Sequence, residues 1–364
     1  MSEAPEIRTT ERLPVSVLTG FLGSGKTTLL KHLLTQPGLE KVAVIVNEFG
    51  EIGLDHTLIE SSSEGVVLLN SGCLCCTVRG DLIDTMRNLF LKRVRGEVPE
   101  FDRVVIETTG LADPAPILHT LMTDPLVAAR FRLDGVVTTV DAVHGESQLD
   151  AQPEPVKQAA VADRIVLTKT DIAEPKKVAT LEERLRRLNP AAPIVRATLG
   201  QIDPRQLMDC GLYDPKSKTA DVSKWLNEEA YASEHGHEHH HHDHEHHDHG
   251  HAHLDVNRHD DRIRAFCLSF DRQFHWAEIA EALDLFAQTH GPNLLRVKGI
   301  LNVIESEKPI VVHGVQHLFH PPATLSAWPP GDDKRSRLVF ITRDLDREYV
   351  EKSLDALFKS HAPA

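Results

Sequence analysis

From residue 14 onward, short runs of β-branched and aliphatic residues alternate with amphipathic stretches. Apolar residues that recur on one side predict helices at 26–34, 81–93 and 178–188. Such alternation is typical of an α/β domain, in which helices cover both faces of a mostly parallel sheet. We expect the strands of this sheet at PVSVLT (14–19), VAVIV (42–46), VVLL (66–69), RVVIE (103–107), GVVTTV (135–140) and RIVLT (164–168).

The pattern changes near residue 212, where apolar periodicity gives way to a polar, histidine-dense stretch, and order resumes after Arg262. The rest of the chain predicts a small C-terminal α+β domain. Its strands are expected at IRAFCLSF (263–270), LLRVKGILNVI, PIVVHGV and RLVFIT, and its helices at 275–288 and near 347–358. We therefore divide the chain into an N-terminal tail (1–13), a P-loop domain (14–215), a His-rich linker (216–261) and a C-terminal domain (262–364).

Length and composition agree with a two-domain globular protein of 364 residues. The N-terminus lacks the apolar core of a secretory signal, and no apolar run approaches the roughly 20 residues that span a bilayer. We therefore expect a cytoplasmic protein, in which thiols stay reduced. The net charge of −14 and the lack of a basic run argue against nucleic acid or an anionic membrane as partner. The oligomeric state is left open by the sequence.

One stretch carries the signature of a phosphate-binding loop. GFLGSGKT (20–27) fits G-x-x-x-x-G-K-[ST] at every fixed position, and it follows a predicted strand and opens a predicted helix. Glycines let backbone N–H groups surround phosphate oxygens, and the helix N-terminus favours negative charge. Lys26 would reach the β- and γ-phosphates, and Thr27 would bind Mg²⁺. The alternative is a chance glycine-rich turn. The predicted phosphate-loop residues are Gly20, Gly23, Ser24, Gly25, Lys26, Thr27 and Thr28.

The loop TKTD after the strand RIVL points to guanine as the base. It comprises Thr168, Lys169, Thr170 and Asp171, and the pattern [NT]-K-x-D occupies this place in guanine-specific P-loop proteins. A carboxylate at Asp171 accepts hydrogen bonds from guanine N1–H and N2–H₂, whereas adenine would leave it unpaired. The alternative is an ordinary solvated turn. RATLG (196–200), after the strand PIV, is a weaker candidate for a second loop beside the base.

An acidic residue ends the predicted strand RVVIE. Glu107 is placed to hold Mg²⁺, and Gly110 of ETTG is placed to sense the γ-phosphate. The alternative for Glu107 is a strand-end carboxylate without a role. We expect Lys26, Thr27 and Glu107 to be the residues that act in phosphoryl transfer.

Three of the five cysteines lie together in GCLCC (72–76). A reducing compartment disfavours a structural disulfide, and the P-loop context does not suit a thioredoxin-like C-x-x-C pair. A buried cluster of small apolar side chains remains an alternative. Three thiolates suit tetrahedral Zn²⁺, and a loop after the second strand, NEFG (47–50), supplies Glu48 as fourth donor. The predicted metal site is Cys73, Cys75, Cys76 and Glu48, while Thr27 serves the Mg²⁺.

The tract HEHHHHDHEHHDHGHAH (237–253) holds many of the 23 histidines. Its composition indicates loose binding of Zn²⁺, Ni²⁺ or Co²⁺ by neutral imidazoles. A flexible linker and a purification tag are the alternatives, and an internal, acid-interleaved tract does not suit a tag.

Taken in order, the motifs GFLGSGKTT, NEFG, GCLCC, ETTG and TKTD resemble the CobW/YjiA group of P-loop GTPases, a family of metallochaperones. G-C-x-C-C is the signature of this family. The resemblance covers about 14–215, residues 263–357 resemble the family's C-terminal domain, and a His-rich insertion between them is recurrent. Thr168 opens the base loop where many GTPases have Asn. The resemblance implies a GTP site at Gly20 to Thr27, Glu107 and Thr168 to Asp171, and an internal metal site at Glu48, Cys73, Cys75 and Cys76.

The expected function is therefore a GTPase that carries zinc to client metalloproteins, with metal release timed by GTP hydrolysis. Cobalt is the close second metal, since the same donors bind it and the family also supplies cobalt for cobalamin synthesis. One rival is a His-rich metal buffer whose GTPase activity is incidental. Another is a P-loop kinase with a chance cysteine cluster. No hydrolytic base or arginine finger is evident in the sequence, so slow intrinsic turnover is expected.

Overall fold

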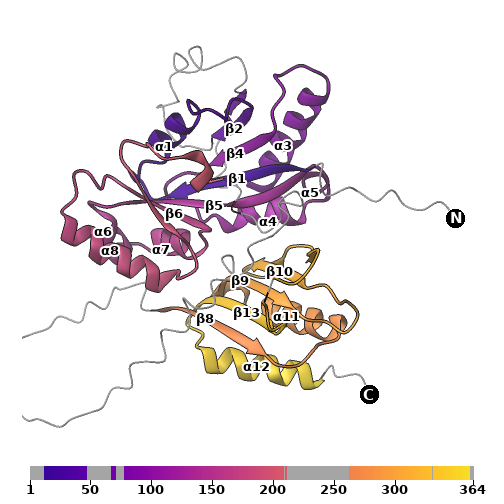
Figure 1. Ribbon diagram of the computed structural model, residues 1–364. Helices are drawn as coiled ribbons and strands as arrows, with labels where there is room; N and C mark the ends of the chain where they lie inside the picture. The colour runs from indigo at the N-terminus through magenta and orange to yellow at the C-terminus, as the bar shows by residue number, and fades with distance from the viewer. Residues whose placement is uncertain are drawn as a thin grey trace, which may run out of the picture.

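The computed structural model describes residues 12–46, 67–70, 78–208, 210, 262–329 and 331–360 of the 364-residue chain. These residues form two sheets with their covering helices (Figure 1). Across the described parts of the chain, no helix is both long and apolar enough to cross a membrane.

The first sheet lies at the centre of the N-terminal half and has seven strands in the order β3-β2-β4-β1-β5-β6-β7 within the described residues. Every neighbouring pair is parallel, which confirms the predicted α/β class. Its strands read as continuous apolar runs because both faces are covered; Val42–Val46, for example, is buried at all five positions. The strands are β1 (Leu13–Gly20), β2 (Val42–Val46), β3 (Val67–Asn70), β4 (Arg103–Glu107), β5 (Phe131–Asp141), β6 (Arg164–Thr168) and β7 (Ile194–Ala197).

Helices cover both faces of this sheet. On one face α1 packs Leu29, Leu30 and Leu33 against the strands. The opposite face is covered by apolar residues of the helices that follow β3, β4, β5 and β6. The helices are α1 (Lys26–Leu33), α3 (Val78–Val94), α4 (Ala115–Thr123), α5 (Pro125–Arg130), α6 (Gly145–Ala151), α7 (Pro153–Ala160) and α8 (Pro175–Leu188).

Strand β5 begins four residues earlier than its apolar pattern predicts, at Phe131 rather than 135. The added segment contains Asp134, which is buried and accepts hydrogen bonds from Ser16 and Arg103 at 2.9 and 2.5 Å. These partners lie on β1 and β4, so the carboxylate is paired across neighbouring strands. A buried charge is tolerated where it is paired, and this pairing is what the local sequence pattern does not reveal.

The second sheet is antiparallel, with the main order β11-β10-β9-β13-β8 and β12 paired to β10. Two helices cover its outer face around Phe266, Phe286 and Phe340, which confirms a C-terminal α+β fold. Its elements are β8 (Ile263–Phe270), α11 (Trp276–His290), β9 (Leu294–Leu301), β10 (Ile310–Val315), β11 (Leu318–Phe319), β12 (Ala323–Thr324), β13 (Ser336–Arg343) and α12 (Arg347–Ser360).

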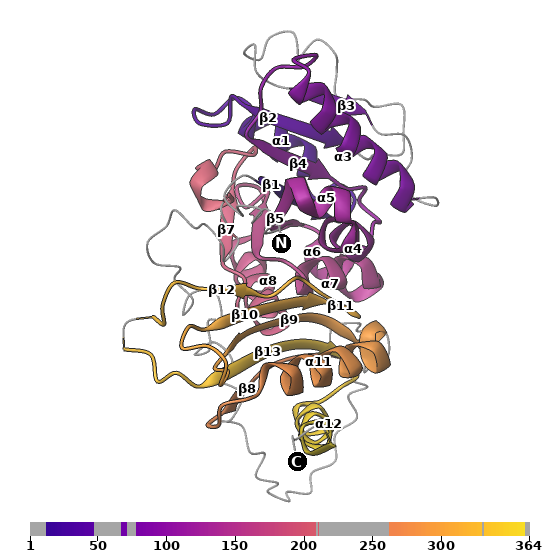
Figure 2. The ribbon, with the colours of Figure 1, turned by 90° about the vertical axis from the view of Figure 1, so that its right-hand side faces the viewer.

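The inner face of the second sheet packs on the P-loop domain, against α4, α7 and α8 (Figure 2). Ile263, Ile300 and Val339 belong to the same apolar cluster as the helix-covered face of the first sheet. The two domains therefore share one continuous core in the described residues. The boundaries at 14–215, 216–261 and 262–364 stay a prediction, because 211–261 lie outside those residues.

This inner face also carries a polar stripe on β9 and β10. Lys298 pairs with His313 in the strand register, and the His313 and His320 rings lie 4.0 Å apart between centroids. Burial, with the nearby Arg296, lowers the pKa of His320 to about 3. Burial, followed by the field of His320, lowers the pKa of His313 well below its usual value. Both imidazoles are thus buried in their neutral form.

Candidate functional site

The predicted phosphate loop follows β1 and turns directly into α1. Gly20 has a φ of 142°, and a Cβ atom there would lie 2.3 Å from Thr139 Oγ1 and 2.4 Å from the Thr139 carbonyl oxygen. Gly25 adopts a φ of 91° at the N-cap of α1. Both positions demand glycine, the first for space and the second for its left-handed conformation. The N-terminus of α1 is thereby aimed at the space above the sheet, as anion binding requires.

Lys26 is buried at the start of α1 and folds back over this loop. Its Nζ donates to the carbonyl oxygens of Gly20 and Phe21, at 2.9 and 3.1 Å. These bonds keep a buried ammonium group solvated by the protein. They also hold the amine within the loop itself, where a phosphate oxygen would compete for it.

Thr27 and Glu107 meet at the carboxyl end of the sheet. Thr27 Oγ1 donates to Glu107 Oε1 at 2.7 Å, and Glu107 is 1% exposed. The parallel register places Glu107 beside Leu18 of β1 and Val46 of β2. A hydroxyl and a carboxylate are hard oxygen donors, the type that Mg²⁺ prefers. The predicted pair is therefore brought together from positions 80 residues apart.

The predicted base loop is tied to the phosphate loop by hydrogen bonds. Thr168 Oγ1 donates to the carbonyl oxygen of Ser24 at 2.7 Å, while Ser24 Oγ lies 2.6 Å from Thr139 Oγ1. Lys169 has a φ of 58°, which turns the chain out of β6, and Asp171 is exposed beyond it. The two loops thus form one structural unit at the ends of β1 and β6.

Asp141, at the end of β5, is a site residue that the sequence analysis missed. Its Oδ2 accepts from Lys169 Nζ at 2.7 Å and lies 3.1 Å from His144 Nδ1. Burial opposes ionisation of Asp141, yet the hydrogen bond from Lys169 keeps its pKa below the usual value. The carboxylate positions Lys169, and its place at a strand end, like that of Glu107, was the signal available in the sequence.

The loop after β7 also reaches α1. Leu199 and Gly200 adopt φ angles of 50° and 78°, and a Cβ atom at Gly200 would lie 2.7 Å from the Thr28 carbonyl oxygen. RATLG thus lies on the first turn of α1, and its role beside the base stays a prediction. Thr28 itself is exposed.

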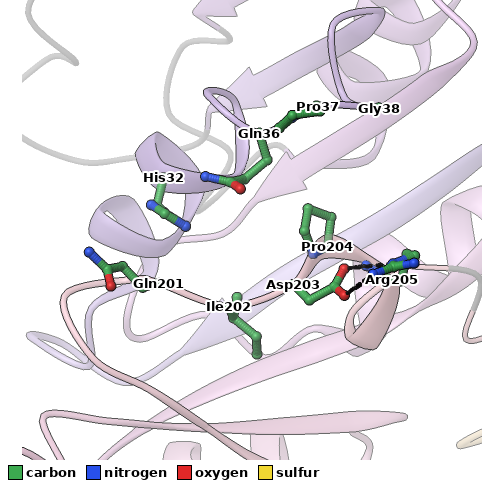
Figure 3. Close-up of a pocket in the computed structure, with 9 residues that line it drawn as sticks. All are labelled: His32, Gln36, Pro37, Gly38, Gln201, Ile202, Asp203, Pro204 and Arg205. Carbon is green, nitrogen blue, oxygen red and sulfur yellow. Dashed lines mark hydrogen bonds and ion pairs between the residues drawn. The ribbon is translucent and has the colours of Figure 1, made fainter.

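A pocket lies beside this loop and the C-terminal end of α1 (Figure 3). Asp203 and Arg205 form an ion pair at one end, and His32 and Gln201 lie at the other. None of the predicted phosphate-loop residues lines this pocket, so it is separate from the predicted phosphate site. Its lining is His32, Gln36, Pro37, Gly38, Gln201, Ile202, Asp203, Pro204 and Arg205.

Gly110, in the loop between β4 and α4, packs against the phosphate loop. A Cβ atom at this position would lie 2.6 Å from the backbone nitrogen of Leu22. Only glycine therefore permits the close approach of these two loops. The predicted γ-phosphate sensor is in contact with the predicted phosphate loop.

The predicted metal ligands lie outside the described residues: Glu48, Cys73, Cys75 and Cys76, together with the histidine tract at 237–253. The strands that precede the two ligand segments are described. Val46, the last residue of β2, pairs in register with both Asn70, the last residue of β3, and Glu107. Three adjacent strands therefore end level with one another. In the remainder of the chain, as the structure describes it, no three His, Cys, Asp or Glu side chains gather as a metal site.

Comparisons with known proteins cover both domains. The family described as "CobW/HypB/UreG, nucleotide-binding domain" matches residues 14–196, and "Cobalamin synthesis protein cobW C-terminal domain" matches residues 263–358. The chain is 34% identical to the zinc chaperone YjiA of Escherichia coli (strain K12) over 351 residues, covering 95% of this chain and 99% of that protein. It is 31% identical to the zinc chaperone CobW of Pseudomonas aeruginosa over 381 residues, covering 96% and 92%.

A solved structure supports the same relationship. The crystal structure of Zn(II)-bound YjiA GTPase from E. coli matches with a TM-score of 0.66 and 30% sequence identity, covering 95% of this chain and 99% of that chain. The likeness thus extends over the P-loop sheet and the antiparallel sheet together.

Proposed function

Because the chain belongs to the CobW/HypB/UreG family and is a P-loop GTPase, we propose that it is a metallochaperone. It binds GTP at the phosphate loop and passes zinc to client metalloproteins. The kinase alternative loses its support, since the family match and the two zinc-chaperone relatives extend over the motifs that suggested it.

In the proposed GTP site, the backbone amides of Gly23 to Thr27 face the phosphates and Lys26 exchanges its carbonyl partners for phosphate oxygens. Thr168, Lys169 and Asp171 hold the base side. Asp141 supports Lys169 through the 2.7 Å contact described above. In this way both halves of the nucleotide are held by loops that are already bonded to each other.

Mg²⁺ fits the oxygen donors of Thr27 and Glu107, which would hold it. When bound, it neutralises charge on the β- and γ-phosphates. Glu107 would also keep the Thr27 hydroxyl oriented through its 2.7 Å hydrogen bond. With no arginine finger evident in the sequence, we expect slow intrinsic hydrolysis that a client protein accelerates.

One observation carries the link between nucleotide and cargo metal. The ends of β2 and β3, at Val46 and Asn70, lie in register with Glu107 at the proposed Mg²⁺ position. The segments that contain Glu48 and the three cysteines follow directly from those ends. A change at Glu107 on GTP binding therefore occurs beside the start of the Glu48 segment and one strand away from the start of the cysteine segment.

We infer a cycle on this basis. GTP binding completes a zinc site of Cys73, Cys75, Cys76 and Glu48, and hydrolysis opens that site. Linkage is reciprocal, so metal must tighten GTP binding by the factor by which GTP tightens metal binding. Zinc is favoured over cobalt because thiolates with a carboxylate suit it and two relatives carry the name zinc chaperone. The histidine tract gathers metal loosely.

The test is a competition titration of Zn²⁺, Co²⁺ and Ni²⁺ with and without a Mg²⁺–GTP analogue. The wild type should bind zinc at least fivefold more tightly with the analogue than with GDP, and Cys73→Ser should lose that difference. Cys267→Ser, at a cysteine of β8 in the C-terminal domain, is the matched control. Equal zinc affinity with analogue and GDP would sink the coupling. If deletion of 235–253 removes most metal delivery while Cys73→Ser does not, the protein is a buffer instead.

A further inference from the structure

Side chains of helix α7 bind the loop that follows β4. Gln158 is fully buried in the middle of the molecule, and its Nε2 donates to the carbonyl oxygens of Gly110 and Ala112, at 3.2 and 3.0 Å. The neighbouring Lys157 pairs with Asp113 at 3.1 Å. Two consecutive residues of one helix thus hold residues 110–113, the loop that contacts the phosphate loop through Gly110.

Only the Nε2 group of the Gln158 side chain bonds to this loop. Its Oε1 atom is buried and has no hydrogen-bond partner within the described residues. Gln158 also lines a small pocket with Phe21 of the phosphate loop and Thr139 of β5. A buried acceptor without a donor costs about 1–3 kcal/mol. A movement of the loop that offers an N–H group to Oε1 would regain this free energy.

The C-terminal end of α7, where Gln158 also lies, is connected to the C-terminal domain. Asn189 Nδ2 donates to the carbonyl oxygens of Ala159, Ala160 and Ala162, at 2.9, 3.1 and 2.9 Å, which secures the end of the helix. Asp163 follows. Its Oδ1 lies 2.9 Å from Arg296 and 2.7 Å from Lys298 on the inner face of β9.

The Asp163 contacts are strong enough to transmit a displacement. All three side chains are at least nine-tenths buried, and the Asp163 carboxylate also accepts from the backbone N–H of Val136 at 3.0 Å. Separating a buried charge from its partners costs several kcal/mol, on the order of 3–5. A shift of α7 would therefore carry β9 with it rather than break these contacts.

The loop has a second connection to the same sheet. Asp113 Oδ1 accepts from the backbone N–H of Ala115 at the start of α4, and His119 of α4 lies with its Nε2 3.0 Å from the Val315 carbonyl oxygen. Residues 110–113 are thus flanked by two helices, and each helix contacts the C-terminal sheet. The loop cannot move far without affecting that interface.

We propose that Gln158 is a positioning residue that couples the loop at 110–113 to the docking of the C-terminal sheet, so that bound nucleotide changes the hold on β9. The inference rests on the proposed GTP site. When a γ-phosphate draws Gly110 away, the bonds from Gln158 either break or pull α7 along, and Asp163 transmits the shift to Arg296 and Lys298. By reciprocity, loosening β9 changes the preference of the site for GTP over GDP.

The test compares Gln158→Leu with Gln148→Leu in the full chain. Leucine matches the size of glutamine but cannot donate to the Gly110 and Ala112 carbonyls. Gln148 lines the same small pocket, which makes it the matched control. Amide hydrogen exchange of β9 is measured with Mg²⁺–GTP analogue and with Mg²⁺–GDP, and nucleotide affinities are measured on the same samples by titration.

In the wild type and Gln148→Leu, we expect β9 exchange rates to differ about fivefold or more between the two nucleotides. In Gln158→Leu the difference should fall below about twofold, although both nucleotides still bind. Lys157→Met, which removes the ion pair of a partly exposed side chain with Asp113, should give an intermediate value. Asp163→Asn should raise β9 exchange with both nucleotides alike.

Two results would overturn the proposal. The coupling is overturned if nucleotides bind normally and Gln158→Leu keeps the wild-type difference in β9 exchange between GTP analogue and GDP. It is also overturned if the wild type binds both nucleotides but shows no such difference. Neither result contradicts the GTP site. Failure of the wild type to bind either nucleotide overturns the proposed GTP site and the coupling together. Because affinity and exchange are read from the same samples, the two failures are distinguished.

Discussion

The hydroxyl of Thr168 donates a hydrogen bond of 2.7 Å to the carbonyl oxygen of Ser24, which joins the end of β6 to the phosphate loop. The same hydroxyl also contacts the Val140 carbonyl oxygen at 3.2 Å. Threonine at this position, where many GTPases have asparagine, is thus able to tie the base loop to the phosphate loop. This bond fixes the start of the predicted base loop relative to the phosphate loop.

Replacing Thr168 by valine tests this role. Valine keeps the shape of threonine but leaves two buried carbonyl groups without their donor, so the two loops lose their fixed spacing. We expect GTP and GDP affinity to fall together by about tenfold, or ~1.4 kcal/mol. Equilibrium titration with both nucleotides measures this change. Thr168→Ser, which retains the hydroxyl, should stay within about twofold of the wild type, and an equal loss in both variants would contradict the role.

Asp171→Asn is expected to change base preference. The carboxylate accepts two N–H donors of guanine, whereas an amide offers one acceptor and one donor. GTP affinity should fall at least tenfold, while xanthosine triphosphate, with a carbonyl in place of the guanine amino group, should bind better than it does to the wild type. Competition between the two nucleotides reads this directly. Asp203→Asn, at a partly exposed aspartate of the neighbouring pocket, is the control. Unchanged selectivity would remove Asp171 from the site.

Glu107→Gln should impair hydrolysis more than binding. The amide can still accept from Thr27 Oγ1, but it loses the negative charge that attracts Mg²⁺. We expect turnover of GTP to fall about 100-fold and the Mg²⁺ concentration for half-maximal rate to rise. Phosphate release measured across a Mg²⁺ series separates these effects. Glu100→Gln, just before the amino end of the same strand, should behave like the wild type. A parallel response in both variants would argue against a site at Glu107.

The buried histidines predict a loss of stability in mild acid. Burial, with Arg296 and Arg12 nearby, lowers the pKa of His320 to about 3. As the pH falls below 6.5, His320 therefore becomes protonated in the unfolded chain while it stays neutral in the folded chain. Stability contributed by His320 is therefore complete above pH 6.5 and is lost as the pH falls toward 3. His313, whose pKa is lowered in the same direction, adds to this slope.

Denaturant unfolding between pH 6.5 and 5 measures the effect. Each such histidine contributes a slope of at most about 1.4 kcal/mol per pH unit, and His320→Gln should remove its share. Burial opposes ionisation of Asp163, but Arg296 and Lys298 lower its pKa to about 2, so its contribution is lost only below about pH 4 and does not interfere. His32→Gln, at a histidine outside the interface, is the control. A slope that His320→Gln leaves unchanged would contradict this account.

The parallel sheet could be predicted because its strands are buried on both faces. Runs such as Val42–Val46 contain no polar residue, and each ends at a loop with recognisable chemistry. Thr27 and Glu107 were each predicted beside Mg²⁺, and the structure brings them into direct contact at the carboxyl ends of the strands. Glu48 and the three cysteines remain predictions, because they lie outside the described residues.

The sequence analysis missed two kinds of feature: helices with a weak apolar pattern, and buried charges whose partners lie far away in the sequence. Helix α4 begins after Pro114 and buries His119 and Thr120, so its apolar pattern is interrupted, and the helices α5 and α6 are too short to show a clear period. The charges of Arg296 and Lys298 suggested no burial at all. Their partner Asp163 lies 133 residues from Arg296, and such pairing is invisible to a local pattern.

Gly20 has a consequence for how binding free energy is distributed. The backbone at this position packs against Thr139 with no room for a Cβ atom, so contact with the sheet fixes the conformation of the phosphate loop. A nucleotide that enters a preorganised cradle does not have to order it, which removes an entropic cost of binding. More of the interaction with the γ-phosphate then remains to displace the residues around Gly110. A phosphate loop held rigidly at Gly20 thereby favours movement of the loop at Gly110 when nucleotide binds.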